Sequence, residues 1–271
     1  MTPPFVRVVA PLAGLALVAG CAARPSQSPT PSTSTLVAVF AHPDDETIVG
    51  PALARAARDG AKVYLVVATD GRKGVSRHAG IPGGDSLATV RAGEARCSAA
   101  ALGVQPPVLL GFEDAGLAVL RPWPGEPLDR MAKRIETTLR ELRPDVVLTW
   151  GPEGGYGHQD HRLVGDVVTQ VFQSGAAGAA RLFYVGFTAD RIAGAPRWYG
   201  NRVYPTAPAL LTTRIAFDER ELAAARRSIA CHRSQATEAE MSEIYNALSH
   251  LWNGEVAFQQ WRGGPRASKF F

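Results

Sequence analysis

The chain has 271 residues, of which 20% are charged and 46% hydrophobic, and its 29 basic and 25 acidic residues leave a formal net charge of +4. This balance excludes an intrinsically disordered chain, and the length suits one large α/β domain or two small ones. The lysines and arginines are scattered rather than clustered, which argues against a nucleic-acid-binding surface.

The first 21 residues have the pattern of a targeting sequence. Arg7 supplies a positive start, and the apolar stretch 8–20 has the length of a signal segment, shorter than the roughly 20 residues of a membrane-spanning helix. The stretch ends in Val-Ala-Gly-Cys, which resembles a bacterial lipobox and makes Cys21 the expected lipidation site. A plain signal peptide, or a buried apolar strand with a chance cysteine, is the alternative.

The residues that follow divide into a tether and a folded domain. Residues 22–35 are rich in proline, serine and threonine, and we expect a flexible tether there. Residues 36–271 are expected to form a single domain. Together with the lipobox, this predicts an extracytoplasmic lipoprotein that is anchored in the cell membrane and faces outward. Of the two remaining cysteines, Cys97 lies in a helical pattern, and we expect it to be a buried thiol rather than the partner of Cys231.

Short apolar runs alternate with helical patterns along the rest of the chain. Strands are expected at 36–40, 63–67, 108–110, 146–148 and 182–185. Helices are expected at 46–59, 88–102, 131–142 and 163–172, and again at 219–231 and 237–252. Apart from those last two helices, residues 191–271 are hard to assign. The alternation predicts a three-layer, Rossmann-like α/β fold, with a mostly parallel sheet and helices on both of its faces.

The polar clusters of interest follow the expected strands, where such folds bind their ligands. His42 and Asp45 follow the first strand, and His161 follows the fourth. Two histidines and a carboxylate with an open position suit a zinc ion that binds and acidifies water. Asp44 is left over beside them and is the natural general base.

His158 lies three residues before His161 and can donate a proton to the oxyanion or the leaving group. Asp160 can hold the imidazole of His158 in a useful tautomer. The simpler alternatives are that Asp44 or Asp45 is only a helix N-cap and that a lone loop histidine is only a surface residue.

Two motifs resemble the PIG-L/LmbE-like family of zinc N-deacetylases: Ala41-His42-Pro43-Asp44-Asp45-Glu46 and Tyr156-Gly157-His158-Gln159-Asp160-His161. The resemblance runs from residue 36 to about 190, with a weaker echo at 230–235. It implies that His42, Asp45 and His161 bind zinc, that Asp44 is the base, and that His158 is the acid or oxyanion partner, oriented by Asp160.

The same resemblance implies further roles. It implies that Tyr156 polarises the amide carbonyl. It also implies that Arg91, in an Arg-x-x-Glu segment, contacts the substrate and that Asp114 holds sugar hydroxyls. The chain departs from the family at Arg72, where many relatives carry a glutamate. We therefore expect Arg72 to alter the rim that meets the substrate.

These observations predict a zinc-dependent hydrolase that removes an acetyl or another small acyl group from the nitrogen of an amino sugar or glycoconjugate. The alternative is a protein that binds the metal but does not catalyse a reaction: a non-catalytic zinc- or sugar-binding lipoprotein of a transport system. An intracellular deacetylase of thiol biosynthesis is a third possibility, which the lipobox disfavours.

Overall fold

The computed structural model describes Met1 and residues 33–118, 127–195 and 203–271. The chain divides into two units, residues 1–32 and 33–271, and the fold below is that of the second unit. The expected signal segment, the lipidation site Cys21 and most of the tether lie outside the described residues. In the part of the chain that is described, every helix is too short or too polar to cross a membrane.

A single sheet runs through the second unit. Its described strands follow the order β3-β2-β1-β4-β5-β7-β6. The first five along this order are parallel, and β7 and β6 are added antiparallel at one edge. The bounds are β1 Thr35–Phe40, β2 Lys62–Thr69, β3 Val108–Phe112, β4 Val146–Trp150, β5 Arg181–Val185, β6 Thr213–Ala216 and β7 Glu255–Gln260.

The order of the strands reverses beside β1. Chain order runs outward from β1 to β2 and β3 on one side, and from β4 to β5 on the other. The connections after β1 and β4 therefore leave the sheet toward opposite faces, and folds of this type bind their ligands between such connections, at the carboxyl ends of the strands. This is the edge at which the sequence places its polar clusters.

Alternate residues of β1 enter two separate cores. Leu36, Ala38 and Phe40 pack in one core, whereas Val37 and Val39 pack in the other. This period of two is what a strand buried on both faces requires. The predicted α/β fold with helices on both faces of a mostly parallel sheet is therefore confirmed.

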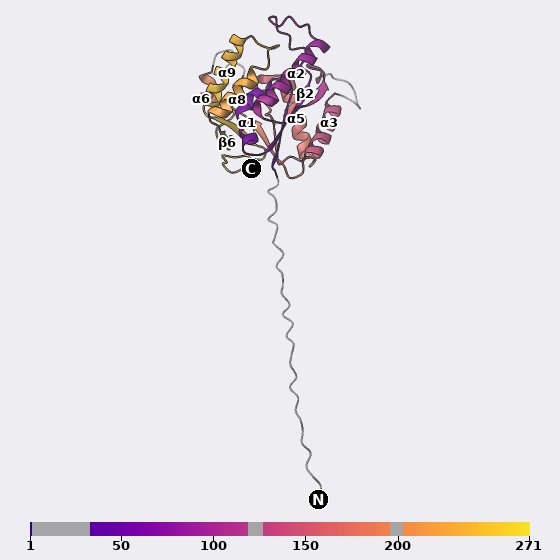
Figure 1. Ribbon diagram of the computed structural model, residues 1–271, viewed down its shortest axis with the longest axis vertical. Helices are drawn as coiled ribbons and strands as arrows, with labels where there is room; N and C mark the ends of the chain where they lie inside the picture. The colour runs from indigo at the N-terminus through magenta and orange to yellow at the C-terminus, as the bar shows by residue number, and fades with distance from the viewer. Residues whose placement is uncertain (2–32, 119–126, 196–202) are drawn as a thin grey trace. The chain divides into compact units, whose positions relative to one another are not determined.

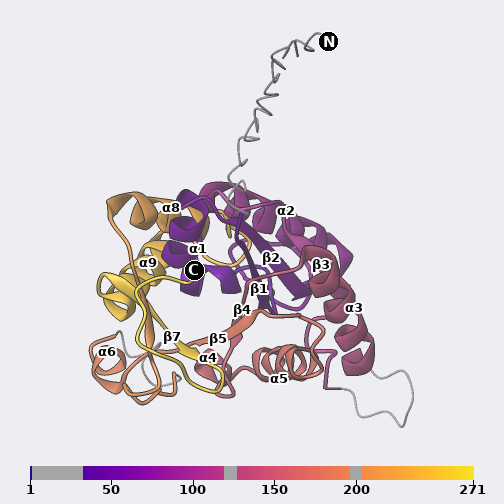
Figure 2. The same cartoon turned by 90° about the horizontal axis from the view of Figure 1, so that it is seen from below.

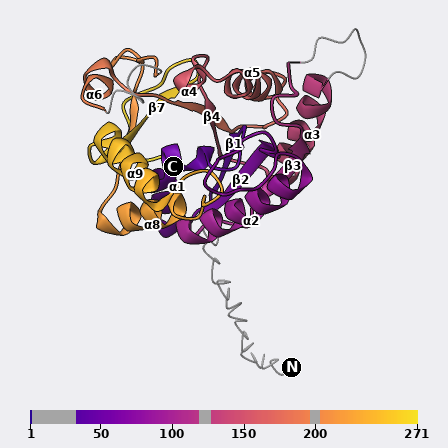
Figure 3. The same cartoon turned by 90° about the horizontal axis from the view of Figure 1, so that it is seen from above.

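The helices form the two outer layers. In Figures 2 and 3, α1, α2, α8 and α9 lie on one side of the sheet and α3 and α5 on the other. Figure 1 shows the same elements from a third direction. The bounds are α1 Gly50–Arg58, α2 Asp85–Leu102, α3 Pro127–Leu142, α4 Gly154–Gly157, α5 Gln159–Gln173, α6 Ala189–Ala193, α8 Glu219–Ile229 and α9 Glu238–Trp252.

Local sequence signals explain where several helices begin and end. α8 and α9 each start with a capping box, in which Asp218 or Thr237 exchanges hydrogen bonds with the residue three positions on. α3 ends at Leu142, two residues before Pro144, as the sequence predicts. α2 ends at Gly103, whose φ of 72° suits glycine.

Two expectations about secondary structure are corrected. The helix expected over 46–59 is a 3-10 turn, η1 (Asp45–Val49), followed by α1. Pro51 favours a helix start. The first N–H groups of a helix have no partner within the helix, so proline, which has no N–H, loses no hydrogen bond there. β6 and β7 were not predicted, because short strands of mixed polarity at a sheet edge carry little periodic signal.

The expectation of a buried thiol at Cys97 is wrong. Cys97 forms a disulfide with Cys231 across 134 residues, with their Cα atoms 5.8 Å apart, and Cys97 lies on the surface of α2. The bond joins α2 to the turn that follows α8. Two cysteines so distant in sequence cannot be paired from their spacing, because only the packing of α2 against α8 brings them together.

Candidate functional site

Three side chains meet in a buried group: His42 from the loop after β1, Asp45 from η1 and His161 from α5. His42 Nδ1 lies 3.2 Å from His161 Nε2, and His161 Nε2 lies 3.1 Å from Asp45 Oδ1. His42 Nδ1 lies 3.8 Å from Asp45 Oδ2. Ligand atoms bound to one tetrahedral zinc ion lie roughly 3.3 Å apart. His42 Nδ1, His161 Nε2 and the carboxylate of Asp45 are therefore close enough together to bind a single metal ion.

Each member of this group is held by its other polar atom. His161 Nδ1 lies 3.1 Å from the carbonyl oxygen of Gly154, so Nδ1 carries the hydrogen and Nε2 stays free to bind a metal. Asp45 Oδ2 accepts the backbone N–H groups of Ala41 and His42, both at 2.9 Å, and the indole N–H of Trp150 at 3.2 Å. Such outer partners orient metal ligands and fix their tautomers.

Negative charge surrounds His42. Its Nε2 lies 3.3 Å from Asp114 Oδ1 and 3.4 Å from Asp160 Oδ2, and its Nδ1 faces Asp45. Burial by itself would lower the pKa of His42, but these three carboxylates raise it well above the ordinary value. A divalent cation bound here would balance the negative charge of these carboxylates. Among the described residues, two further groups that share His42 have ligand atoms within 4.8 Å of one another and could hold a metal ion: His42, His158 and His161, and His42, Asp114 and Asp160.

Asp44 has a strained backbone beside this group. Its φ is 123°, a value that residues other than glycine rarely adopt and that costs about 1–3 kcal/mol. Its N–H donates to Glu46 Oε2 at 3.1 Å, and its carbonyl oxygen accepts from the Thr47 hydroxyl at 2.6 Å. Its carboxylate accepts from the guanidinium of Arg91 at 2.8 Å. Asp44 occupies the N-cap position of η1, but its side chain makes no capping bond within the described structure.

The surroundings make Asp44 more basic than an ordinary aspartate. Burial raises the pKa of Asp44, and the charge of Asp45 raises it further, whereas the charge of Arg91 lowers it; the balance is a raised pKa. The side chain is 35% exposed, so water can reach it. A partly exposed carboxylate with a raised pKa, next to possible metal ligands, suits a proton acceptor.

His158 stands at the N-cap of α5. Its Nδ1 accepts the backbone N–H of Asp160 at 3.2 Å, which leaves the hydrogen of the neutral ring on Nε2. Burial lowers the pKa of His158, and the charges of His42 and His161 lower it further. The carboxylate of Asp160, expected to orient the His158 imidazole, instead contacts His42 and the N–H of Ala115 at 2.8 Å. Asp160 contacts the His158 ring through its backbone N–H.

Tyr156 borders the site from α4, in the loop between β4 and α5. Its ring centroid lies 5.0 Å from that of His161 and 5.9 Å from that of His158, and the residue is 40% exposed. The loop depends on Gly155, which has a φ of 65° and whose missing Cβ would lie 2.8 Å from the Trp150 ring. The glycine lets the loop close onto Trp150, which stacks on His161 with ring centroids 4.3 Å apart.

The three residues expected to meet substrate are bound within the protein. Arg91 is 3% exposed and donates to the carbonyl oxygens of Pro43 and Gly71 as well as to Asp44. Asp114 accepts the N–H of Lys73, and the bond and charge of His42 hold its pKa at about 2 even though burial opposes this. Arg72 pairs with Asp70 at 2.7 Å and with Asp85 at 3.1 Å. Their contacts with substrate stay predictions.

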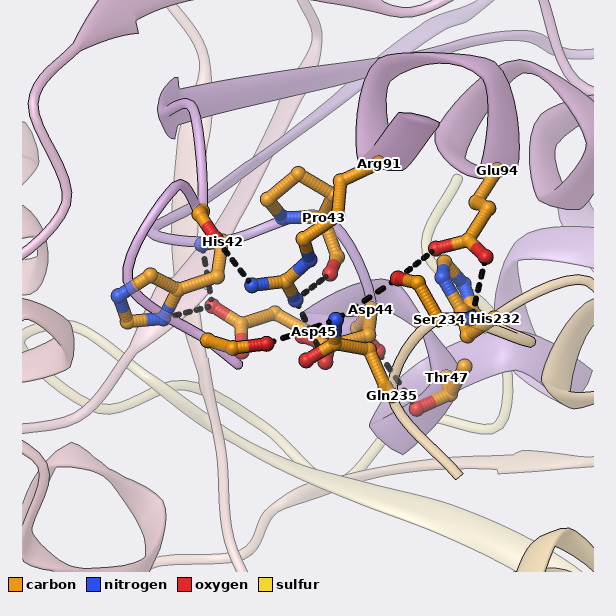
Figure 4. Close-up of polar contacts among 12 residues, drawn as sticks. His42, Pro43, Asp44, Asp45, Thr47, Arg91, Glu94, His232, Ser234 and Gln235 are labelled. Carbon is orange, nitrogen blue, oxygen red and sulfur yellow. Dashed lines mark hydrogen bonds and ion pairs between the residues drawn. The ribbon is translucent and has the colours of Figure 1, made fainter. Parts of the chain in front are cut away.

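The sequence signalled only faintly a polar network behind Asp44. His232 lies 2.8 Å from Glu46, and Ser234 donates from its N–H and its hydroxyl to Glu94, at 2.6 and 2.7 Å. Figure 4 shows this arrangement, with Arg91 and Glu94 reaching from α2 toward the segments 42–47 and 232–235. The only signal for it was the weak resemblance at 230–235. The network ties the C-terminal part of the chain to the loop that carries Asp44.

Comparisons with known proteins show what the chain resembles. The family model PIG-L, described as GlcNAc-PI de-N-acetylase, matches residues 37–172. A 1D-myo-inositol 2-acetamido-2-deoxy-alpha-D-glucopyranoside deacetylase of Rhodococcus jostii is 37% identical over 166 residues, 55% of this chain and 56% of that protein. A protein named as deacetylase 2 for the same compound in Catenulispora acidiphila is 38% identical over 164 residues, 54% of each chain. The chain spans just over half the length of these relatives.

Among solved structures, the N,N'-diacetylchitobiose deacetylase of Pyrococcus horikoshii superposes with a TM-score of 0.61. The alignment covers 85% of this chain and 84% of that one at 20% identity, and at this identity it supports the fold alone.

The expected location, an outward-facing lipoprotein anchored in the cell membrane, is wrong. The relatives are named for a glycoside of inositol and an acetamido sugar. That compound is small and rich in hydroxyl groups, so an enzyme can meet it in water without being held at a membrane. The family match begins at residue 37, beyond the segment that carries Cys21, and gives the lipid anchor no support.

Proposed function

Because the chain belongs to the PIG-L family, we propose that it is a zinc-dependent hydrolase that removes the N-acetyl group of an amino sugar or glycoconjugate. The observation that carries the proposal is that the carboxylate of Asp44, a residue with a strained backbone, lies beside a group of three metal-ligand side chains. His42, Asp45 and His161 are spaced for one metal ion, and Asp44 stands beside them without binding it.

We assign the metal to these three side chains. Two imidazole nitrogens and a carboxylate oxygen are a donor set that zinc accepts, and hydrolytic zinc sites leave a further position open. A zinc ion bound there supplies a Lewis acid that polarises the amide carbonyl and acidifies a water molecule. Asp160 and Asp114 lie within hydrogen-bonding distance of Nε2 of His42, and by accepting its hydrogen they would leave Nδ1 to hold the metal.

The other residues divide the proton transfers. The carboxylate of Asp44 takes a proton from the attacking water, for which its raised pKa suits it. His158 donates from Nε2, and Tyr156 from its hydroxyl, to the amide oxygen as that oxygen becomes negative. The amide C–N bond then breaks, and the amine nitrogen receives a proton from Asp44 or from His158. Asp114 and Arg72 lie on the side of β2 and β3, where we place the sugar hydroxyls.

The relatives' name supplies the first substrate to test, the 2-acetamido glucoside of inositol. The full chain is stripped of metal with a chelator and reloaded with zinc, and acetate release is measured from that glucoside and from N,N'-diacetylchitobiose. Release that requires zinc supports the proposal. A chain that holds zinc at the three ligands but releases no acetate from either compound contradicts it and favours the non-catalytic binding alternative.

A further inference from the structure

A cavity of about 150 Å³ opens directly beside the catalytic group. Asp44, Asp45 and Tyr156 line one end of it. The other walls come from segments far apart in the chain, including η1, the end of β4, α8 and α9. The apolar residues among these walls are chiefly Ile48, Trp150, Phe187, Ile229, Met241 and Ile244.

The cavity is larger than an acetyl group needs. An acetyl group brings only one methyl beyond the carbonyl carbon, whereas an apolar cavity of this volume can hold a molecule the size of benzene. A methyl group in this space would leave most of the apolar wall without contacts. The volume therefore matches an apolar group of about six carbon atoms.

Several polar groups of the cavity wall already bond within the protein. The Thr47 hydroxyl donates to the carbonyl oxygen of Asp44, and Gln235 Nε2 donates to that of Gly74 at 3.1 Å. His232 Nε2 pairs with Glu46, and the buried Nδ1 of the same ring has no hydrogen-bond partner among the described residues. Sugar hydroxyls placed against the apolar wall would lose their hydrogen bonds to water with few replacements, which is unfavourable.

The opposite side of the catalytic group has the contrary character. Asp70, Lys73 and Asp114 lie there on the connections after β2 and β3, and Lys73 and Glu113 form an exposed ion pair at 2.9 Å. Charged and hydrogen-bonding groups suit a sugar, and an apolar wall suits an alkyl chain. The two halves of an N-acylated amino sugar thus have separate places on either side of the scissile amide.

We propose that the cavity under α8 and α9 receives the acyl chain, and that the substrate is an amino sugar bearing an N-acyl chain of about six carbons. The proposal rests on the hydrolase function above. Water adds its oxygen to the acyl carbon, the C–N bond breaks, the acyl chain leaves as a carboxylate, and both protons of the water end on the nitrogen, so that the sugar keeps a protonated amine.

A chain-length series tests the proposal. The zinc-loaded full chain is given N-acetyl, N-butanoyl, N-hexanoyl and N-octanoyl glucosamine, and release of the free amine is measured. Each methylene that enters the apolar cavity is expected to raise kcat/KM by about fourfold, until the cavity is full near six carbons. Octyl N-acetylglucosaminide, which carries its chain on the sugar, is expected to gain nothing over N-acetylglucosamine.

The outcomes separate this proposal from the function on which it rests. If N-acetyl is cleaved faster than every longer chain, or if the octyl glycoside is the better substrate, the acyl assignment is overturned and the hydrolase function stands. If no member of the series and neither acetylated compound tested above is cleaved by the zinc-loaded chain, the function itself fails.

Filling the cavity tests the same point from the protein side. Met241→Trp on α9 occupies the space, and the ratio of kcat/KM for hexanoyl over acetyl is expected to fall at least tenfold. Ile244→Phe, at a half-buried position on the same helix, is a second variant should the first fail to fold. Glu243→Gln, exposed on α9, is the control and keeps the wild-type ratio. An unchanged ratio in a folded Met241→Trp or Ile244→Phe protein overturns the proposal.

Discussion

The guanidinium of Arg91 lies 2.8 Å from the carboxylate of Asp44, and it also donates to the carbonyl oxygen of Pro43 immediately before it. The buried Arg91 side chain therefore hydrogen-bonds both to the backbone next to Asp44 and to the Asp44 carboxylate. The φ of Asp44 is 123°. Glu46 and Thr47 hold the backbone of Asp44 from the other direction. A strained conformation persists where its surroundings over-determine it, and these contacts do so here.

The Arg91 contact yields a kinetic prediction. Arg91→Lys keeps the charge and loses the planar fork, so the carboxylate of Asp44 should be held less well while the metal ligands stay in place. We expect kcat to fall by about 10-fold or more with little change in KM, because the loss concerns a reacting group. A rise in KM with unchanged kcat would show instead that Arg91 contacts substrate, as the family resemblance implies. Steady-state kinetics with equal zinc content decide between the two.

Removing any metal ligand should remove the metal. His42→Ala, Asp45→Ala and His161→Ala each delete one of three buried donor atoms, and we expect zinc content to drop well below one ion per chain and activity to disappear. His250→Ala, an exposed residue on α9, is the matched control and should retain both. Elemental analysis after gel filtration measures the metal. Full zinc occupancy in any of the three variants would remove that residue from the ligand set.

Replacing the proposed base should separate metal binding from turnover. Asp44→Asn keeps the shape of the side chain and loses its basicity, so zinc should stay bound while kcat falls by about 10²–10⁴-fold. The loss should appear in kcat more than in KM, because proton transfer occurs on the way to the transition state. Rates and zinc content are measured on the same preparation. Wild-type turnover by zinc-loaded Asp44→Asn would end the assignment of Asp44 as the base.

The buried pair of His232 and Glu46 should make stability depend on pH. Burial lowers the pKa of His232, but the charge and hydrogen bond of Glu46 outweigh it and raise the pKa above its ordinary value. The pair therefore contributes fully below the unfolded pKa of about 6.5 and loses its contribution as the pH rises through the raised pKa.

His232→Gln tests this. Breaking a buried pair costs about 3–5 kcal/mol, and we expect the difference in unfolding free energy from wild type to be larger at pH 6 than at pH 9. Urea unfolding at both values measures it. An equal difference at the two values would mean that His232 is neutral in the folded protein.

The disulfide should contribute measurably to stability. The Cys97–Cys231 bond closes a loop of 134 residues, and cross-links of such length stabilise by about 2–5 kcal/mol. Reduction of the folded protein should lower its Tm by several degrees, whereas Cys97→Ser should start from the lower Tm and show no further change on reduction. The prediction would be contradicted if the wild-type Tm were the same before and after reduction, with the free thiols of the reduced protein confirmed by titration.

The sequence by itself determined the framework and the chemical inventory of this protein. Buried strands such as 36–40 are visible as short apolar runs, and the alternation with helical stripes implies a parallel sheet whose polar loops share one edge. The ligand candidates His42, Asp45 and His161 could be named because motif and strand ends coincide. These signals are local, since each depends on neighbouring residues or on a fixed period.

Only the tertiary structure decided how distant side chains pair. Arg91 is buried and contacts Asp44, and the carboxylate of Asp160 contacts His42 rather than His158. Cys97 is bonded to Cys231. The apolar cavity likewise exists only where η1, β4, α8 and α9 converge. No period or spacing in the sequence encodes these contacts, because they depend on the angles at which whole helices pack on the sheet and on which polar group each buried atom finds within hydrogen-bonding distance.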